Sequence, residues 1–305
     1  MLTVWITGAC GFIGRYVAKE YKRKGYYVVG IGHGIWDEDY SKWGLDEWCC
    51  GDITVELLCK ISKLPDVIVH CAGGSSVGKS VAEPRHDYIR TVNSISCVLE
   101  YMRIYSKEAK LVYLSSAAVY GITDSLPIEV DCKTNPISPY GVHKKMSEDL
   151  CIIYGRQYGI KSVIMRLFSV YGNGLRKQLL WDACRKISAG RNTFFGTGEE
   201  TRDWIHVADV ARYIEEAYQY AGIEVPIFNL ACGKSVRIID VLNILFKYMG
   251  TTEKPVFGGQ KDVGNPVHYW ADISGLKLWQ TKSCVLLEDG IKSYVEWFAK
   301  NEKKN

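Results

Sequence analysis

This sequence of 305 residues lacks the features of several large classes of protein. Its eleven cysteines form no C-x-x-C pair and it contains no H-E-x-x-H segment, so we expect reduced thiols and no metal site. No apolar run reaches the roughly 20 residues of a membrane helix. The basic residues form no block, which argues against a nucleic-acid partner. The run after Met1 has neither a basic leader nor a cleavage site, so we expect a cytoplasmic protein.

What the sequence does contain is a regular alternation of apolar β-type runs with helix-period segments. Fully apolar strands separated by helices predict a parallel sheet covered on both faces, which is a doubly wound α/β domain. The helical pattern is clearest at 13–25 and 85–105. The expected strands lie at 2–7, 26–31, 66–72, 110–116 and 161–167.

After residue 167 this pattern loosens, and glycine-rich turns separate the helical segments. We therefore expect the larger α/β domain to span residues 1–167 and a smaller, substrate-binding domain to span 168–305. Some segments of the second part are expected to return to the core of the first. The expected helices of this second part lie near 176–190, 207–221, 236–249 and 286–299.

The first predicted strand runs directly into TGACGFIG, which places Gly8, Gly11 and Gly14 on the turn into the first helix. A turn of this kind lets the backbone approach a pyrophosphate, whose charge the helix N-terminus then stabilises. The glycines could instead serve only a tight turn. Their place after the first strand of an α/β domain favours dinucleotide binding.

A second motif, YGVHK, places Tyr140 four residues before Lys144. The helix that we expect after Pro139 presents both side chains on one face. A nearby ammonium lowers the pKa of a phenol, so Tyr140 is predicted to exchange a proton with a substrate hydroxyl or carbonyl close to neutral pH. The alternative is a surface pair without a chemical role.

Further motifs connect these two and extend over nearly the whole chain. They are GDIT (51–54), HCAGGSSVG (70–78), SSAAVYG (115–121), RLFSVYGNG (166–174) and TRDWIHVADVA (201–211). With them the chain resembles the extended short-chain dehydrogenase/reductase family, in its nucleotide-sugar epimerase/dehydratase group. The resemblance implies a Rossmann-type domain, a nucleoside-diphosphate sugar as substrate, and a homodimer formed through the helices that contain Asn93 and Tyr140. It assigns Ser116, rather than Ser115, as the catalytic hydroxyl that acts with Tyr140 and Lys144.

The resemblance also implies a set of cofactor contacts. Asp52 and Ile53 are expected beside the adenine, and the loop of Cys71, Ala72 and Gly73 beside the pyrophosphate and ribose. The full expected set is Gly8, Gly11, Phe12, Ile13, Gly14, His33, Asp52, Ile53, Cys71, Ala72, Gly73, Asn93, Tyr140, Lys144 and Leu167.

The adenosine end leaves the choice between NAD and NADP open. Relatives that prefer NAD usually carry an acidic residue at the end of the second strand, where this chain reads GIGHGIW, with no carboxylate before Asp37. Gly32 and His33 leave room for a 2′-phosphate, which favours NADP, although no arginine stands nearby.

On the substrate side, the resemblance places Arg202 where relatives bind a nucleotide diphosphate, a role that suits a guanidinium. The alternative for Arg202 is an ion pair with Asp203 or Asp209. The expected substrate contacts are Ser76, Ser116, Ser169 and Arg202.

The residues expected to bind the nucleotide part of the substrate differ from those usual in the family. Ser169 stands where many relatives have asparagine. A second phosphate-binding arginine is expected before YWADIS, but that region offers only Lys261 and Asp262. These departures leave the base and the sugar of the substrate open.

Three reactions are compatible with such a site: reduction of a 4-keto sugar, epimerisation at C4, and 4,6-dehydration. Dehydratases of the family need an acid and a base directly after the catalytic serine, where this chain has Ala117 and Ala118, so we discount dehydration.

The missing carboxylate favours an NAD(P)H-dependent reductase of an NDP-4-keto-6-deoxyhexose, in deoxysugar or surface-glycan biosynthesis such as that of O-antigen. Ser75 points the same way, because galactose epimerases commonly have a cofactor-contacting lysine there. The alternative is a 4-epimerase with tightly bound NAD. A third hypothesis is a dinucleotide sensor without catalytic activity. The presence of all three residues Ser116, Tyr140 and Lys144 argues against it.

Overall fold

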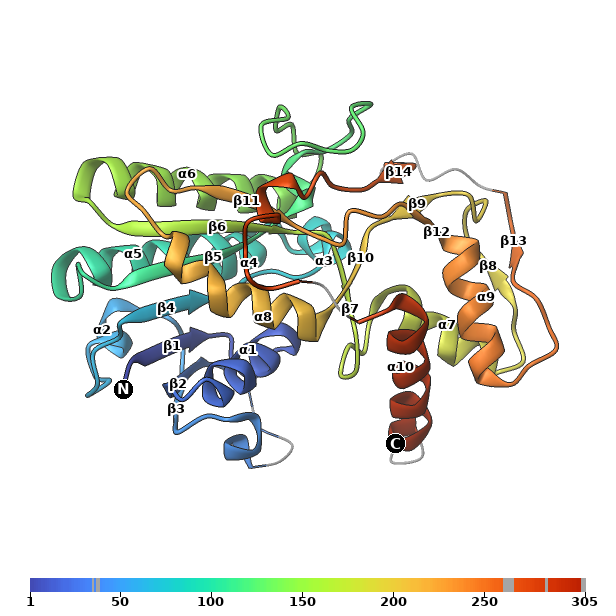
Figure 1. Cartoon of the computed structure of the whole chain (residues 1–305), viewed down its shortest axis with the longest axis horizontal. Helices are drawn as coiled ribbons and strands as arrows, with labels where there is room; N and C mark the ends of the chain where they lie inside the picture. Colours follow the sequence, from blue (N-terminus) through green and yellow to red (C-terminus); the bar gives the residue numbers. More distant parts are fainter. Residues whose placement is uncertain (35, 37–38, 260–265, 283–284, 303–305) are drawn as a thin grey trace.

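A seven-stranded, fully parallel sheet forms the centre of the computed structural model, which describes residues 1–34, 36, 39–259, 266–282 and 285–302 (Figure 1). The strand order is β11-β6-β5-β4-β1-β2-β3. Because β1 lies between β2 and β4, the chain changes direction across the sheet at β1, and a crevice at the carboxyl ends of β1 and β4 is expected there. The strands are β1 (Thr3–Thr7), β2 (Tyr27–Gly32), β3 (Glu47–Cys50), β4 (Val67–His70), β5 (Lys110–Ser116), β6 (Lys161–Leu167) and β11 (Ile227–Leu230).

Helices cover both faces of this sheet, as the fully apolar strands require. On one face, α1 (Phe12–Arg23) packs against α8 (Val207–Ala217) over the strands. On the other face lie α2 (Val55–Leu58), α5 (Ser94–Tyr105) and α6 (Pro139–Tyr158). Apolar side chains fill the space between each helical layer and the sheet, so two separate cores hold the strands in place.

Clear local signals set the ends of α6, which brings part of the site to the sheet. The Ser138 hydroxyl accepts a hydrogen bond from the backbone N–H of Gly141 at 3.1 Å, and Pro139 occupies the first helical turn. At the other end, Gly159 has a φ of 73°, a left-handed conformation that glycine adopts without strain.

The segment between β4 and α5 is more irregular than the helix expected at 85–105. It consists of α3 (Val77–Ala82), α4 (Pro84–Tyr88) and a π-helical turn at Ile89–Asn93 that leads into α5. The hydroxyl of Ser94 donates to the carbonyl of Arg90 at 2.5 Å, within this turn. A π turn shifts the faces of the helix that follows, which matters for the site described below.

A smaller group of elements lies beyond the carboxyl ends of the strands (Figure 1). The helices α7 (Gln178–Ser188), α9 (Ile238–Met249) and α10 (Leu287–Glu302) share a third apolar core. Three small sheets, separate from the main one, accompany this group. They are β7 (Ser169–Tyr171) with β10 (Trp204–His206), β8 (Thr193–Phe194) with β13 (Val256–Phe257), and β9 (Thr201–Arg202) with β12 (Val236–Arg237) and β14 (His268–Tyr269). Short 3-10 turns occur at Tyr40–Trp43, Ala117–Val119, Tyr218–Tyr220 and Ser274–Leu276.

The predicted doubly wound α/β fold is confirmed, and the five expected strands correspond to β1, β2, β4, β5 and β6. The sequence prediction did not include β3 and β11. β11 belongs to the second half of the chain but pairs with β6 in the main sheet. The division at residue 167 stays a prediction. In the described part of the chain, no helix is long and apolar enough to cross a membrane.

Candidate active site

The glycine-rich turn after β1 forms a cradle that side chains would fill. Gly8 has a φ of 69°, and a Cβ there would lie 2.8 Å from the backbone nitrogen of Ala72, at the end of the neighbouring strand β4. A Cβ on Gly14 would lie 2.3 Å from the carbonyl oxygen of Gly8. The first turn of α1 has no acidic residue and Gly11 provides no side-chain cap, so its N–H groups suit a pyrophosphate. This cradle fits a dinucleotide.

Ser116, Tyr140 and Lys144 meet at the wall of a cavity of about 590 Å³ at the carboxyl end of the sheet. Ser116 is the last residue of β5, and its hydroxyl accepts from the backbone N–H of Ala118 at 3.2 Å. Tyr140 lies in the first turn of α6, and Lys144 follows one turn later on the same face. The ammonium of Lys144 donates to the carbonyl of Leu114 at 2.8 Å.

The electrostatics of this group differ from the sequence-based expectation. Burial raises the pKa of Tyr140 above its ordinary value of 10.0, against the lowering effect of a hydrogen bond with Ser116. Burial also lowers the pKa of Lys144 from 10.5 to about 8, although the Asp87 carboxylate opposes this change. The expectation that the Lys144 ammonium brings the pKa of the Tyr140 phenol close to neutral is therefore wrong for this structure: burial raises that pKa, and the ammonium donates to a backbone carbonyl.

A second layer of polar residues supports the site, and the sequence prediction missed it. Asp87 is buried, and its Oδ2 lies 2.6 Å from Nδ1 of His143, one residue before Lys144. Thr91 is buried as well, and its hydroxyl accepts from the backbone N–H of Gly74 at 2.9 Å. α-Helical spacing in the sequence gives no reliable signal for this pair, because a π turn begins between Asp87 and Thr91, although both residues lie beside Gly74.

The structure does not bring Asn93 to the cavity. Its side chain is exposed and it is not one of the described residues that line the cavity. The π turn moves Thr91 to the inner face, where its hydroxyl lies 3.6 Å from the position of a Cβ on Gly73. Thr91 thus contacts the loop of Gly73 and Gly74 from this segment, whereas Asn93 is exposed.

The other predicted cofactor residues fall into two groups. Five of them line the cavity, and four lie near the ends of β2 and β3 or beside the glycine turn. The lining residues are Phe12, Ile13, Cys71, Gly73 and Leu167. The others are His33, Asp52 and Ile53 at the strand ends, while Ala72 adjoins Gly8.

A carboxylate does reach the end of β2, although it comes from another strand. Oδ1 of Asp52, which follows β3, lies 2.6 Å from Nε2 of His33. Both side chains are exposed at this edge of the sheet. Asp37, the first carboxylate along the sequence after β2, lies outside the described residues.

Three polar residues near the site serve the fold. His70 is buried, with Nδ1 2.9 Å from the Thr7 hydroxyl, and burial lowers its pKa to about 3. His206 accepts at Nδ1 from the backbone N–H of Ala208 at 3.2 Å and so caps α8. Ser115 donates to the Glu148 carboxylate at 2.5 Å. The contact with Glu148 gives Ser115 a structural role that its neighbour Ser116 does not share.

The smaller group of elements contributes cations to the opposite wall of the cavity. Arg202 lines it and donates through one guanidinium nitrogen to the carbonyls of Thr201 and Val267, at 2.8 and 3.2 Å. Ser169 and Lys177 also line the cavity. Lys261 and Asp262, which stand where a second arginine was expected, lie outside the described residues.

Both aspartates considered as ion-pair partners of Arg202 make contacts with other groups. Asp203 accepts from the backbone N–H groups of Cys232 and Gly233, at 2.8 and 2.9 Å. Asp209 forms an ion pair with Arg212.

The predicted substrate residue Ser76 has a structural contact. Its hydroxyl accepts from the backbone N–H of Lys79 at 3.4 Å and caps α3. Of the described residues that line the cavity, Ser75 is one and Ser76 is not.

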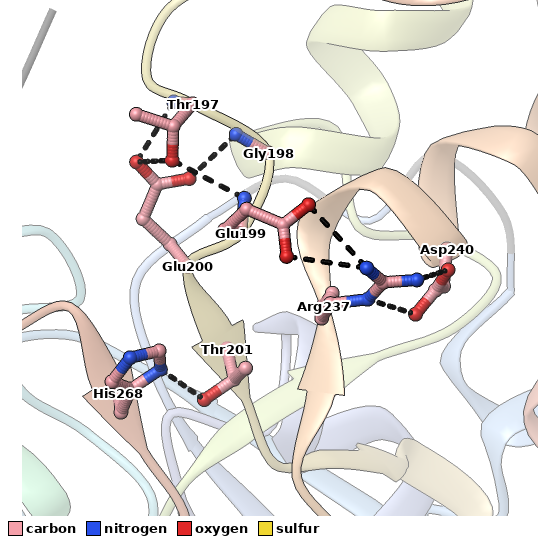
Figure 2. Close-up of polar contacts among 8 residues, drawn as sticks. All are labelled: Thr197, Gly198, Glu199, Glu200, Thr201, Arg237, Asp240 and His268. Atoms are coloured by element: carbon pink, nitrogen blue, oxygen red, sulfur yellow. Dashed lines mark hydrogen bonds and ion pairs between the residues drawn. The ribbon is translucent and has the colours of Figure 1, made fainter. Parts of the chain in front are cut away.

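The turn that leads into Arg202 is fixed by its own side chains (Figure 2). The carboxylate of Glu200 accepts from the backbone N–H groups of Thr197 and Gly198, at 2.9 and 2.8 Å. Arg237 donates to the two carboxylates drawn beside it and so ties this turn to the start of α9. Arg202 is thus presented by a rigid turn.

Among the described residues, no group of three or more His, Cys, Asp or Glu side chains is placed to hold a metal ion.

Comparison with known proteins agrees with this geometry. A UDP-glucose 4-epimerase from Azospirillum brasilense is 30% identical over 291 residues, covering 86% of this chain and 82% of that protein. The structure of UDP-glucose 4-epimerase from Thermotoga maritima with UDP-glucose has a TM-score of 0.87 at 25% identity, covering 99% and 100% of the two chains. That of UDP-glucuronic acid 4-epimerase from Bacillus cereus, with UDP-glucuronic acid and NAD, has a TM-score of 0.86 at 28% identity, covering 98% and 100%. The model of the NAD dependent epimerase/dehydratase family matches residues 4–231, and the chain belongs to that family.

Proposed function

We propose that this protein is a nucleotide-sugar 4-epimerase that works with a retained NAD. The observation that carries the proposal is the meeting of Ser116, Tyr140 and Lys144 at one wall of a cavity that Arg202 borders on the other side. The named relatives with solved structures are 4-epimerases of UDP-glucose and UDP-glucuronic acid. They favour the epimerase, the alternative in the sequence prediction, over the 4-ketoreductase that it placed first.

The position of Asp52 supports NAD rather than NADP. The sequence favoured NADP because β2 ends without a carboxylate, but the Asp52 carboxylate reaches that edge from the neighbouring strand and is held by His33. A 2′-phosphate placed there would face a negative charge, whereas a ribose diol could donate hydrogen bonds to it. The B. cereus structure contains NAD.

In the proposed reaction, Tyr140 exchanges a proton with the oxygen on C4 of the sugar, and Ser116 orients that oxygen by a second hydrogen bond. The glycine turn of Gly8, Gly11 and Gly14 would hold NAD, which would serve as the acceptor of the C4 hydride and its donor for the return to the opposite face. Burial and the Asp87 carboxylate raise the pKa of the Tyr140 phenol, and the hydrogen bond with Ser116 lowers it. The Asp87 carboxylate also favours the charged form of Lys144.

Dehydration is not part of the proposal. Ala117 and Ala118 follow Ser116 directly in a 3-10 turn, and a methyl group transfers no proton. The carbonyl of Ala117 accepts from the Tyr269 hydroxyl at 2.5 Å, which fixes this turn against β14.

We further propose that the protein forms a homodimer through α5 and α6. Val142, Met146 and Ile153 of α6 are exposed although apolar, and their spacing of four and seven places them on one side of the helix. Ile104 at the end of α5 is also exposed. A partner of the same kind would cover these side chains.

The test of the proposed function is an assay without added nicotinamide. Purified protein is incubated with UDP-glucose, UDP-glucuronic acid or UDP-N-acetylglucosamine, and the C4 epimer is followed by chromatography. We expect conversion of at least one sugar in both directions, and a loss of at least about 100-fold in Tyr140→Phe. Consumption of NADPH with an NDP-4-keto-6-deoxyhexose, without any epimer, would instead identify the reductase. Turnover of no sugar would favour the sensor.

A further inference from the structure

Lys177 reaches across the active cavity and contacts the loop that follows β4. It lies directly before α7 in the smaller group of elements, and its ammonium donates to the carbonyl of Ser75 at 3.0 Å. The two residues are 102 positions apart in the sequence, and both line the cavity. This contact therefore joins the two sides of the cavity at a point where no motif in the sequence predicted a cation.

The surroundings of this ammonium are unfavourable for a positive charge. Burial and the nearby charge of Lys79 both lower the pKa of Lys177. The first turn of α7 contains no acidic residue, and in the described part of the chain no carboxylate forms an ion pair with Lys177. A bound anion would stabilise the charged form of Lys177, because it would replace water around the ammonium with an opposite charge.

The position of Lys177 indicates which part of a ligand it would meet. The loop that contains Ser75 also contains Gly73, and a Cβ on Gly73 would lie 3.4 Å from the ammonium of Lys144. The same cavity is lined by Phe12 and Ile13, which follow the glycine turn. Lys177 thus faces the space between the dinucleotide cradle and the catalytic group.

We propose that Lys177 binds a diphosphate group in this cavity. The inference rests on the proposed function, because both of its ligands, the dinucleotide and the nucleotide sugar, contain a diphosphate. Lys177 brings an ammonium to the carbonyl of Ser75, and both residues line the cavity, so the charge stands where a bound diphosphate would meet it.

The test is a pair of calorimetric titrations, one with NAD and one with UDP, on wild-type protein freed of ligand. Lys177→Met is expected to raise the dissociation constant of NAD, of UDP or of both by about 10-fold to 100-fold, the range for a hydrogen bond to a charged group. An effect on NAD alone identifies the cofactor diphosphate, and an effect on UDP alone identifies the substrate diphosphate. Lys177→Arg keeps the charge and should bind more like the wild type than like the methionine variant.

Lys186→Met is the matched control, because Lys186 lies in α7, the helix that Lys177 precedes, and donates to the carbonyl of Thr193 at 3.0 Å, outside the cavity lining. It should bind both ligands as the wild type does. Adding Ser75→Lys to Lys177→Met should restore binding, which a merely structural role of Lys177 would not produce.

Unchanged dissociation constants for both ligands in Lys177→Met, or an equal loss in Lys186→Met, would overturn the proposal. Circular dichroism establishes that each variant is folded. The titrations need no turnover, so a protein that binds both ligands through Lys177 but converts no sugar would refute the epimerase and leave this inference standing.

Discussion

Replacing Lys144 with methionine should change how the stability of the cofactor-free protein depends on pH. Burial lowers the pKa of Lys144 from 10.5 to about 8, and the residue is only 5% exposed. Unfolding returns the amine to water and to its ordinary pKa. Between about pH 8 and pH 10.5 the unfolded chain therefore binds a proton that the folded protein does not, so this group makes stability rise with pH.

The size of the effect follows from the same two pKa values. The penalty for burying the ammonium is complete below about pH 8 and disappears above pH 10.5. A difference of about 2.5 pH units, at about 1.4 kcal/mol for each unit, corresponds to about 3 kcal/mol. The free energy of unfolding of the wild type, minus that of Lys144→Met, should therefore rise by about 2 to 3 kcal/mol between about pH 7 and about pH 10.

Urea unfolding followed by tryptophan fluorescence measures this difference. The hydrogen bond to the Leu114 carbonyl is lost in Lys144→Met at every pH, so it shifts the variant's stability without changing the slope. Tyrosines with raised pKa values titrate in both proteins and cancel in the comparison, whereas Cys71 and Cys151 cancel only in part, because the charge of Lys144 lowers the pKa values of their thiols. A stability difference that stays constant from about pH 7 to about pH 10 would refute the idea that burial shifts the pKa of Lys144.

Three further predictions concern the frame of the site, the nucleotide contact and the assembly. Arg166→Met should lower the free energy of unfolding, measured with urea, by about 3 to 5 kcal/mol, because it leaves the Glu148 carboxylate buried without its bidentate partner. The Arg166→Met/Glu148→Leu double variant, which removes that carboxylate as well, should show a smaller loss. Arg202→Met should weaken UDP binding by about 10-fold to 100-fold in calorimetry while NAD binding is unchanged, and equal UDP affinity would contradict its assignment. Met146→Glu should convert the proposed dimer into a monomer in light scattering after gel filtration, and an unchanged mass would count against an interface on α6.

The parts of the fold that could be predicted are those whose side chains carry a strong periodic signal. β1, β2, β4, β5 and β6 are almost completely buried runs, so their apolar sequence marks them clearly. β3 has the half-exposed sequence EWCC, which lacks such a signal. β11 returns to the sheet some sixty residues after β6, and no local pattern predicts which strand it joins.

The site was predictable where chemistry and local structure coincide, and not where it depends on tertiary contacts. Tyr140 and Lys144 share a helical face whatever the rest of the fold does, whereas the pKa of the phenol depends on how deeply it is buried. Asn93 was expected at the site from the family resemblance, but the π turn at Ile89–Asn93 leaves it exposed and places Thr91 beside the loop of Gly74. Lys177 meets Ser75 only after the two parts of the chain have packed together.

The central claim, oxidation and re-reduction at the same sugar carbon, is tested most directly with a UDP-hexose that carries deuterium on C4. The purified protein is incubated with the labelled form of the sugar that it converts, without added nicotinamide, and the product is examined by NMR. The proposed mechanism predicts the C4 epimer with the deuterium still on C4, because the hydride never leaves the site. Loss of the label from C4, or the absence of any epimer from the UDP-hexoses tested, would contradict it.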